Sequence, residues 1–192
     1  MLYKNIEHQA QGIPRPNHTR TKLRLAFPLK EQHQRSEPYV VNQYLAEYQA
    51  LKGSTTYFLE HQAQKKLSVD VVEQAFIGHP TLQLFRRAIL RFGPTCNALI
   101  YAESLLHLSL FTAYQKRALM RGSIAIGKLL DPQQLGLIQK NDIHEQWIHT
   151  PDELNTRYPF ALMRHYHLLY QGEVCAEIRE VLNHESLQRI DD

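Results

Sequence analysis

Charged residues lie inside two apolar stretches of this chain, where their side chains could contact a ligand. The first stretch, Phe85-Arg86-Arg87-Ala88-Ile89-Leu90, reads as a strand that contains cations. The second runs from Met163 to Val181 and reads as a hairpin with Arg164 on one arm and Glu180 on the other. A charge inside a strand is costly unless it is paired or faces a ligand. Two cations and one carboxylate on neighbouring strands suit a small, anionic, oxygen-rich substrate.

Arg87 and Glu180 are the two charged residues that matter most here, and plainer interpretations exist for both. They could form a structural ion pair across a sheet, or they could be two charges on a solvated face. Spacing alone places these structural interpretations ahead of a binding site. The residues by themselves therefore favour a structural role for both.

Other arrangements that support chemistry are weak or absent. The chain has 11 His residues, and His165 and His167 stand two apart on one face of a predicted strand. A metal needs a third ligand nearby, which the sequence does not mark, so a pair of half-exposed sheet histidines is favoured and no metal is predicted. A G-x-S-x-G nucleophile motif is absent. Gly122 and Gly127 lack the spacing and the preceding strand of a dinucleotide site.

Composition indicates an ordinary globular protein. The chain has 192 residues, 43% of them hydrophobic, and a net charge of +3, which is too small to indicate nucleic acid. Residues 1–35 hold seven Lys or Arg and two acids. They are predicted to be a basic, mostly irregular extension, in preference to an arm for RNA or an acidic partner. Residues 36–192 are predicted to form one domain.

The expected compartment is the cytoplasm. The first residues show no apolar secretory segment, and no apolar run reaches membrane-spanning length. Cys96 and Cys175 have no metal or redox spacing. Two reduced thiols fit the cytoplasm, although a single disulfide between them stays open.

Hydrophobic periodicity predicts an α+β fold with an antiparallel sheet and helices packed on it. Helices are expected from Ser36 to Gly53, over 111–120 and over 124–130. The β-formers of Ser54–Leu59 favour an extended segment, and Thr150–Pro159 is expected to be a loop long enough to cover a site. Further strands are expected around 67–71 and over 85–92, 98–106, 145–149, 162–170 and 174–182.

Five segments, in order, resemble the chorismate pyruvate-lyase family, especially its actinobacterial, cyanobacterial and plastid branch. Together they cover about residues 50–184. They are Gly53-Ser54-Thr55-Thr56, Arg87-Ala88-Ile89-Leu90-Arg91-Phe92-Gly93, Tyr101-Ala102-Glu103-Ser104-Leu105, Ala125-Ile126-Gly127-Lys128-Leu129-Leu130, and Arg164-His165-Tyr166 followed by Gly172 and Glu180.

The resemblance implies a chorismate lyase, which releases pyruvate from chorismate and leaves 4-hydroxybenzoate, with no metal or organic cofactor. It implies that Arg87 binds the ring carboxylate and that Glu180 contacts the ring hydroxyl as orienter or general base. Arg164 is the candidate for the second carboxylate. Thr55, Ile126 and Gly127 are the remaining predicted substrate-binding residues.

The sequence departs from the family pattern at Thr55, where Met or Leu is usual, and at His165 and His167, where basic residues are common. The alternative is therefore a binding domain of the same fold that senses a small aromatic carboxylate without turnover. The expected partners are chorismate and 4-hydroxybenzoate, without nucleic acid or a membrane span. The expected state is a monomer or weak homodimer.

Overall fold

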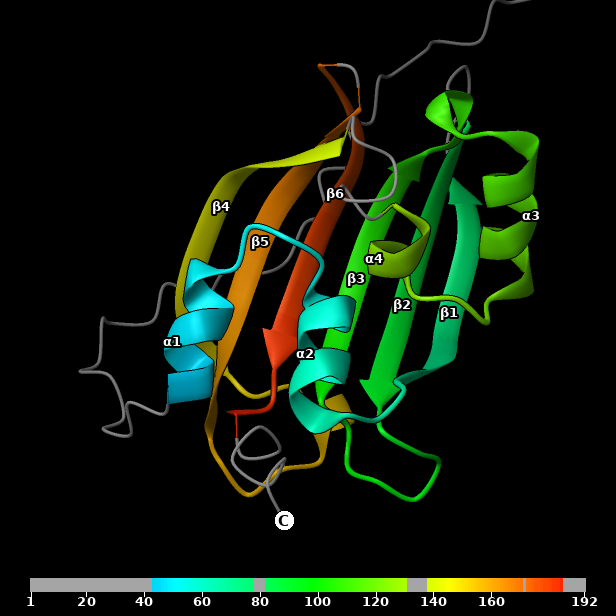
Figure 1. Ribbon diagram of the computed structural model, residues 1–192. Coiled ribbons are helices and arrows are strands. Elements are labelled where there is room, and N and C mark those ends of the chain that lie inside the picture. Colours follow the sequence, from blue (N-terminus) through cyan, green and yellow to red (C-terminus); the bar gives the residue numbers. More distant parts are fainter. Residues whose placement is uncertain (1–42, 78–81, 131–137, 171, 185–192) are drawn as a thin grey trace, which may run out of the picture. The chain divides into compact units, whose positions relative to one another are not determined.

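The computed structural model describes residues 43–77, 82–130, 138–170 and 172–184. The strands in this part of the chain form one antiparallel sheet in the order β1-β2-β3-β6-β5-β4 (Figure 1). The strands are β1 (Ser68–Ile77), β2 (Gln83–Arg91), β3 (Ile100–His107), β4 (Ile138–His149), β5 (Phe160–Tyr170) and β6 (Glu173–Leu182). The helices are α1 (Gln43–Ala50), α2 (Thr55–Ala63), α3 (Ala113–Arg121) and α4 (Ile126–Leu129), with 3₁₀ turns η1 (Leu108–Leu110) and η2 (Asp152–Leu154).

The predicted α+β class is confirmed. The predicted hairpin is β5–β6, and Gly172 in its turn has a φ of 84°, a conformation that glycine adopts without strain. The predicted extension, residues 1–35, and the expected helix start at Ser36 lie outside the described residues. In the part of the chain that the structure describes, no helix is long and apolar enough to cross a membrane.

The segment Ser54–Leu59, expected to be extended, is instead the start of α2. Ser54 is the N-cap, and its side chain accepts a hydrogen bond from the backbone N–H of Tyr57 at 3.4 Å. Leu59 is fully buried on the helix. A capping residue and one buried helical face outweigh the weak β-propensity of threonine and aromatic residues.

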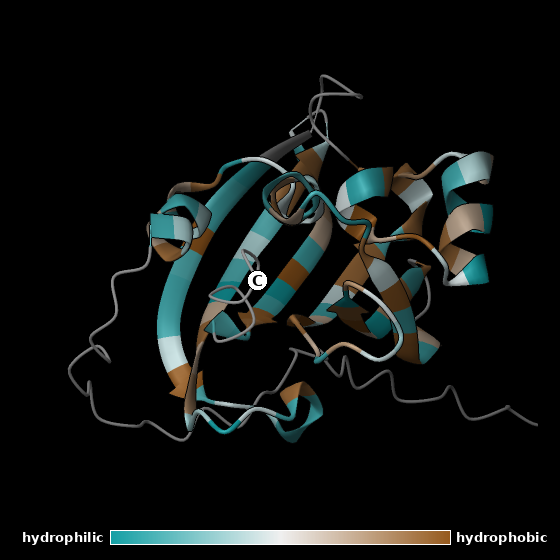
Figure 2. Ribbon diagram, turned by 60° about the horizontal axis from the view of Figure 1, so that its bottom comes forward, coloured by the Kyte–Doolittle hydropathy of each residue, from teal (hydrophilic) through white to brown (hydrophobic). Residues whose placement is uncertain are grey.

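The sheet has two faces with different coverings. Helices α1 to α4 lie over one face, called here the helical face; the opposite face is called the outer face (Figure 1). Hydrophilic and hydrophobic residues are mixed along most of the strands (Figure 2). Two buried hydrophobic clusters fill the helical face, and a third, which includes Leu154 of η2 and Tyr101 of β3, lies on the outer face.

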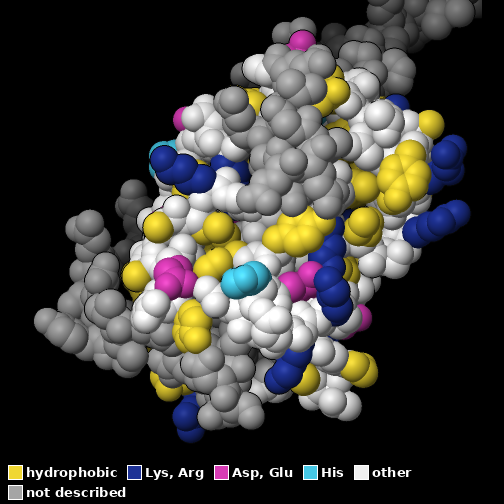
Figure 3. Space-filling model, viewed as in Figure 1, with side chains coloured by type: hydrophobic (Ala, Val, Ile, Leu, Met, Phe, Trp, Pro, Cys, Tyr) yellow, Lys and Arg dark blue, Asp and Glu magenta, His cyan; other side chains and the backbone are white. Residues whose placement is uncertain are grey.

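The space-filling view from the helical side shows hydrophobic side chains mixed with both signs of charge (Figure 3). Some Lys and Arg side chains lie beside Asp or Glu near the centre of this view, and others stand apart at its right edge. The solvent-exposed side of the helices therefore carries both charged and hydrophobic side chains, while their other side packs on the sheet.

Candidate functional site

A pocket lies on the helical face, between the middle of the sheet and the segments around α2 and α4. It holds about 690 Å³ of empty space, its open mouth included. Small side chains on β2 and β3 form its floor, namely Ala88, Ala102 and Ser104. The rest of the lining is mostly apolar, with three charged residues: Arg86, Lys140 and Glu180. An apolar pocket with a few converging polar groups is the usual form of a small-molecule site.

Arg86 of β2 is a buried cation without a carboxylate partner among the described residues. Only 1% of the residue is exposed. Its guanidinium donates to the backbone oxygen of Gly122 at 2.9 Å and to that of Ile124 at 3.0 Å, while its buried Nε has no hydrogen-bond partner in the described part of the chain. Burial lowers the pKa of Arg86. A desolvated, unneutralised guanidinium is a strong site for an anion.

Glu180 of β6 is held on both of its carboxylate oxygens. Oε1 accepts from the hydroxyl of Thr55 at 2.8 Å and from that of Tyr48 at 3.1 Å. Oε2 accepts from the hydroxyl of Tyr166 at 3.3 Å. Burial raises the pKa values of both tyrosines well above their usual range, with Glu180 adding to the effect, so they remain donors. The carboxylate is thus fixed in position at the pocket wall.

The predicted residues Thr55, Ile126 and Gly127 all line the pocket. Thr55 is the first residue of α2, and Gly127 lies where α4 approaches the start of that helix. A Cβ at Gly127 would lie 2.7 Å from Oγ of Ser54. A glycine at this position therefore allows the close approach of α4 to the cap of α2.

Lys140 of β4 is a functional candidate that sequence reasoning missed. Its buried Nζ has no hydrogen-bond partner within the described residues and lies 4.4 Å from the centre of the Tyr166 ring. Burial lowers the pKa of Lys140 to about 8; the charge of Glu180 opposes this shift and that of Arg164 adds to it. The pocket therefore contains a second cation on the same face of the sheet. It stands on β4, the edge strand farther from the Arg86 strand β2.

Arg164 lies directly opposite Glu180 in the β5–β6 ladder, as the hairpin pattern indicated, but it is outside the pocket lining. Its guanidinium donates to the backbone oxygens of Tyr48 at 2.8 Å and Leu51 at 2.9 Å. Its Nε lies 3.0 Å from Oε1 of Glu145, and Nη1 lies 4.0 Å from Oε1 of Glu180. Arg164 thus anchors the end of α1 to the sheet, and the expectation that it faces a substrate carboxylate is not met.

Arg87 lies on the outer face, so the expectation that it shares a pocket with Glu180 is wrong. Its side chain pairs with Glu73 at 2.7 Å and with Glu103 at 3.0 Å. Neighbouring residues of a strand project to opposite faces, and Arg86 is the one that reaches the pocket. A one-residue error in phase exchanges the whole set of side chains between the two faces.

The Thr150–Pro159 loop, expected to be a lid, packs against the outer face. Leu154 in its 3₁₀ turn is fully buried in the outer-face cluster with Tyr101 and Val181. The loop covers hydrophobic side chains there and is not part of the pocket lining. By contrast Ser54, in the turn after α1, does line the pocket.

Two sequence expectations about cysteine and metal chemistry can be compared with the structure. Cys96 and Cys175 are both free, and burial raises the pKa of Cys175 to about 11. A third possible ligand does stand near His165 and His167, because Glu177 lies beside them on the outer face. The expectation that this third group is missing is wrong.

Comparisons with known proteins identify the family. The family model described as chorismate pyruvate-lyase Rv2949c-like matches residues 51–190. A search of curated proteins finds no match. Three similar solved structures are bacterial proteins.

The first of these is a possible transcriptional regulator, YydK, from Bacillus subtilis, with 13% identity and a TM-score of 0.44 over 62% of this chain and 59% of that chain. The second is gene product SA0254 from Staphylococcus aureus, with 12% identity and a TM-score of 0.48 over 62% and 84%. The third is a GntR-family transcriptional regulator from Bacillus cereus, with 11% identity and a TM-score of 0.46 over 62% and 93%. The family model covers most of the chain and includes the elements that build the pocket, so the chain belongs to the chorismate pyruvate-lyase Rv2949c-like family.

Proposed function

We propose that the pocket binds chorismate and releases pyruvate from it to give 4-hydroxybenzoate. One observation carries the proposal: a mostly apolar pocket in a chain of this family contains two buried cations and one fixed carboxylate. Chorismate carries two carboxylates and one ring hydroxyl. The charges of the pocket therefore complement the charges and the hydrogen-bonding group of the substrate.

Arg86 is the proposed partner of the ring carboxylate, in place of Arg87. Its planar fork already donates to two backbone oxygens, and its Nε is left for a ligand. Glu180 lies two strands away on β6, across the small side chains of Ala102 and Ser104 on β3. A flat ring lying over this floor has its carboxylate at Arg86 and its hydroxyl, on the opposite ring carbon, at Glu180.

Lys140 is the proposed partner of the enolpyruvyl carboxylate. That group is attached to the ring carbon beside the hydroxyl, so it belongs on the Glu180 side of the pocket. Lys140 interacts electrostatically with Glu180 and lies over the Tyr166 ring. Its charge would also stabilise the enolpyruvate as negative charge develops on the leaving oxygen.

The reaction breaks one carbon–oxygen bond and moves one proton. The ring carbon that bears the hydroxyl loses its hydrogen as the ether bond breaks, and the enolpyruvyl methylene gains a proton to become the methyl group of pyruvate. Aromatisation of the ring supplies much of the driving force. In this pose Glu180 accepts a hydrogen bond from the ring hydroxyl and lies beside the carbon that loses its proton. This position suits an orienting residue or a general base. The remaining task is to position the substrate away from water.

The test is to incubate the purified full-length protein with chorismate and measure both products. We expect equimolar 4-hydroxybenzoate, by chromatography, and pyruvate, by coupled reduction with lactate dehydrogenase. A reaction without protein measures spontaneous decay, and one with an Arg86→Gln variant tests whether product formation depends on the pocket. Binding of 4-hydroxybenzoate without turnover would instead support the sensor-type alternative. Neither binding nor turnover would refute the proposed function.

A further inference from the structure

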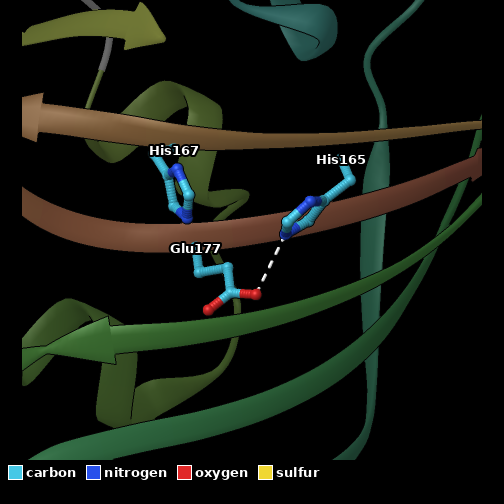
Figure 4. Close-up of side chains that lie close together, drawn as sticks. All are labelled: His165, His167 and Glu177. Carbon is cyan, nitrogen blue, oxygen red and sulfur yellow. Dashed lines mark hydrogen bonds and ion pairs between the residues drawn. The ribbon is translucent and has the colours of Figure 1, made fainter. Parts of the chain in front are cut away.

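Three side chains of metal-ligating type meet on the outer face, on the side of the sheet away from the pocket. His165 and His167 project from β5, and Glu177 projects from β6 directly opposite His167. Figure 4 shows the two imidazole rings turned toward the carboxylate of Glu177. The proposed function uses none of these three residues.

The distances between these groups are close to those of a metal site. Nε2 of His165 lies 2.9 Å from Oε1 of Glu177, and one ligand atom from each of the three residues lies within 4.8 Å of the others. Nitrogen and oxygen ligands lie about 2.0–2.1 Å from zinc, which puts tetrahedral ligand atoms roughly 3.3 Å apart. Small side-chain rotations would therefore be enough to close the site, without movement of the strands.

Asp142 gives His167 the kind of support that metal-bound histidines usually have. Its Oδ2 lies 3.5 Å from Nδ1 of His167. Asp142 occupies an irregularity in the β4–β5 pairing and has a φ of 51°. A carboxylate near Nδ1 favours the proton on that nitrogen, which leaves Nε2 of His167 for a metal.

We propose that His165, His167 and Glu177 form a site for a divalent transition metal, with zinc as the reference ion. Two imidazoles and one carboxylate suit zinc and its neighbours rather than calcium or magnesium, which prefer oxygen ligands. The side chains of all three residues are about 30% exposed, so an ion can reach them from solvent. Water completes the coordination.

The bound metal would link β5 to β6. The opposite faces of these same strands carry Tyr166 and Glu180, which line the pocket. The metal has no contact with the substrate in this arrangement. Its expected effect is on stability, because an ion that binds only the folded chain stabilises it in proportion to the logarithm of its concentration.

The test uses metal-free, full-length protein and zinc chloride alone. At a free zinc concentration 100-fold above Kd, the midpoint of thermal unfolding should rise by roughly 5–10 °C. Titration calorimetry should show one zinc ion whose affinity falls about tenfold or more in His167→Gln and in Glu177→Gln. Cobalt(II) should give the visible absorption bands of a four-coordinate ion in the wild type and lose them in both variants.

His61→Gln is the matched control, because His61 is an exposed histidine on α2, outside the cluster. It should keep the zinc affinity, the thermal shift and the cobalt bands. Equal zinc binding in the wild type, His167→Gln and Glu177→Gln would assign the metal to other histidines and overturn the proposal. No thermal shift with zinc would also overturn it. Either failure would leave the proposed lyase reaction unaffected, because the pocket lies on the other face of the sheet.

Discussion

Replacing Arg86 by glutamine is expected to abolish most of the affinity for 4-hydroxybenzoate. Arg86 is 1% exposed and has no carboxylate partner among the described residues, so a ligand carboxylate would neutralise its charge in a dry site. A hydrogen bond to a charged group contributes about 1.5–3 kcal/mol. Loss of this contact should therefore raise Kd by roughly 10-fold to 150-fold. Arg86→Lys should restore little, because an ammonium group cannot hold the two backbone oxygens and a carboxylate in one plane.

Arg87→Gln is the matched control, because it changes the neighbouring arginine on the other face. Arg87 pairs with Glu73, where both side chains are 41–47% exposed, and with the buried Glu103, which also accepts from Tyr101. The variant should lose about 1 kcal/mol of stability. Its affinity for 4-hydroxybenzoate should stay within about twofold of the wild type.

Titration calorimetry with 4-hydroxybenzoate and thermal unfolding with and without the ligand separate these effects. Arg86→Gln should lose the ligand-induced rise in unfolding temperature even where the ligand-free protein remains folded. Arg87→Gln should keep that rise. Normal affinity in Arg86→Gln together with lost affinity in Arg87→Gln would refute the assignment of faces on which the proposed function depends.

Three further predictions concern the rest of the pocket. The pKa of Lys140, about 8 when buried and 10.5 ordinarily, means that the unfolded chain binds more protons between these pH values. The unfolding free energy should therefore rise with pH from 8 to 10.5, by up to about 3 kcal/mol relative to Lys140→Met. The affinity for an anion should fall above pH 8. If the unfolding free energies of the two proteins, measured with denaturant, changed with pH in the same way, the prediction would be contradicted. Glu180→Gln should lower kcat by about tenfold or more while changing the Kd for 4-hydroxybenzoate less, and an unchanged kcat would exclude Glu180 from the chemistry. Gly127→Ala should cost about 1–3 kcal/mol of stability and weaken ligand binding, because the new Cβ would lie 2.7 Å from Oγ of Ser54. Gly93→Ala is the control: its Cβ would have its nearest contact at 3.8 Å, so stability and binding should stay unchanged.

The strands and the final hairpin could be predicted because alternating apolar residues and glycine turns mark them directly. Which residues of β2 face the helices, and which face the other side of the sheet, could not be predicted. Leu84, Ala88 and Leu90 are apolar on one face and Phe85 and Ile89 on the other, since helices cover one side and η2 with its cluster covers part of the other. Either arginine of the pair therefore fits the same hydrophobic pattern.

Lys140 shows a second limit of sequence reasoning. It stands in the polar run Gln139-Lys140-Asn141-Asp142, where nothing marks one residue as buried. Its burial depends on Tyr166 of the neighbouring strand, which lies beneath its ammonium group. Similarly, the helix at Thr55 depends on the local Ser54 cap and on the burial of Leu59, which is a tertiary effect.

The pocket selects the thickness of a ligand and its charge with different residues. The floor of small side chains, Ala88, Ala102 and Ser104, limits the thickness. Arg86 and Lys140 stand on β2 and β4, the second strand from one edge of the sheet and the strand at the other edge, so the sheet's own hydrogen bonding fixes the spacing of the charges. The floor lies between them and limits the bulk of whatever spans that distance. A larger residue at Ala102 would exclude thicker ligands while leaving the demand for two anionic groups intact. Ligand size and ligand charge can thus change independently in this protein.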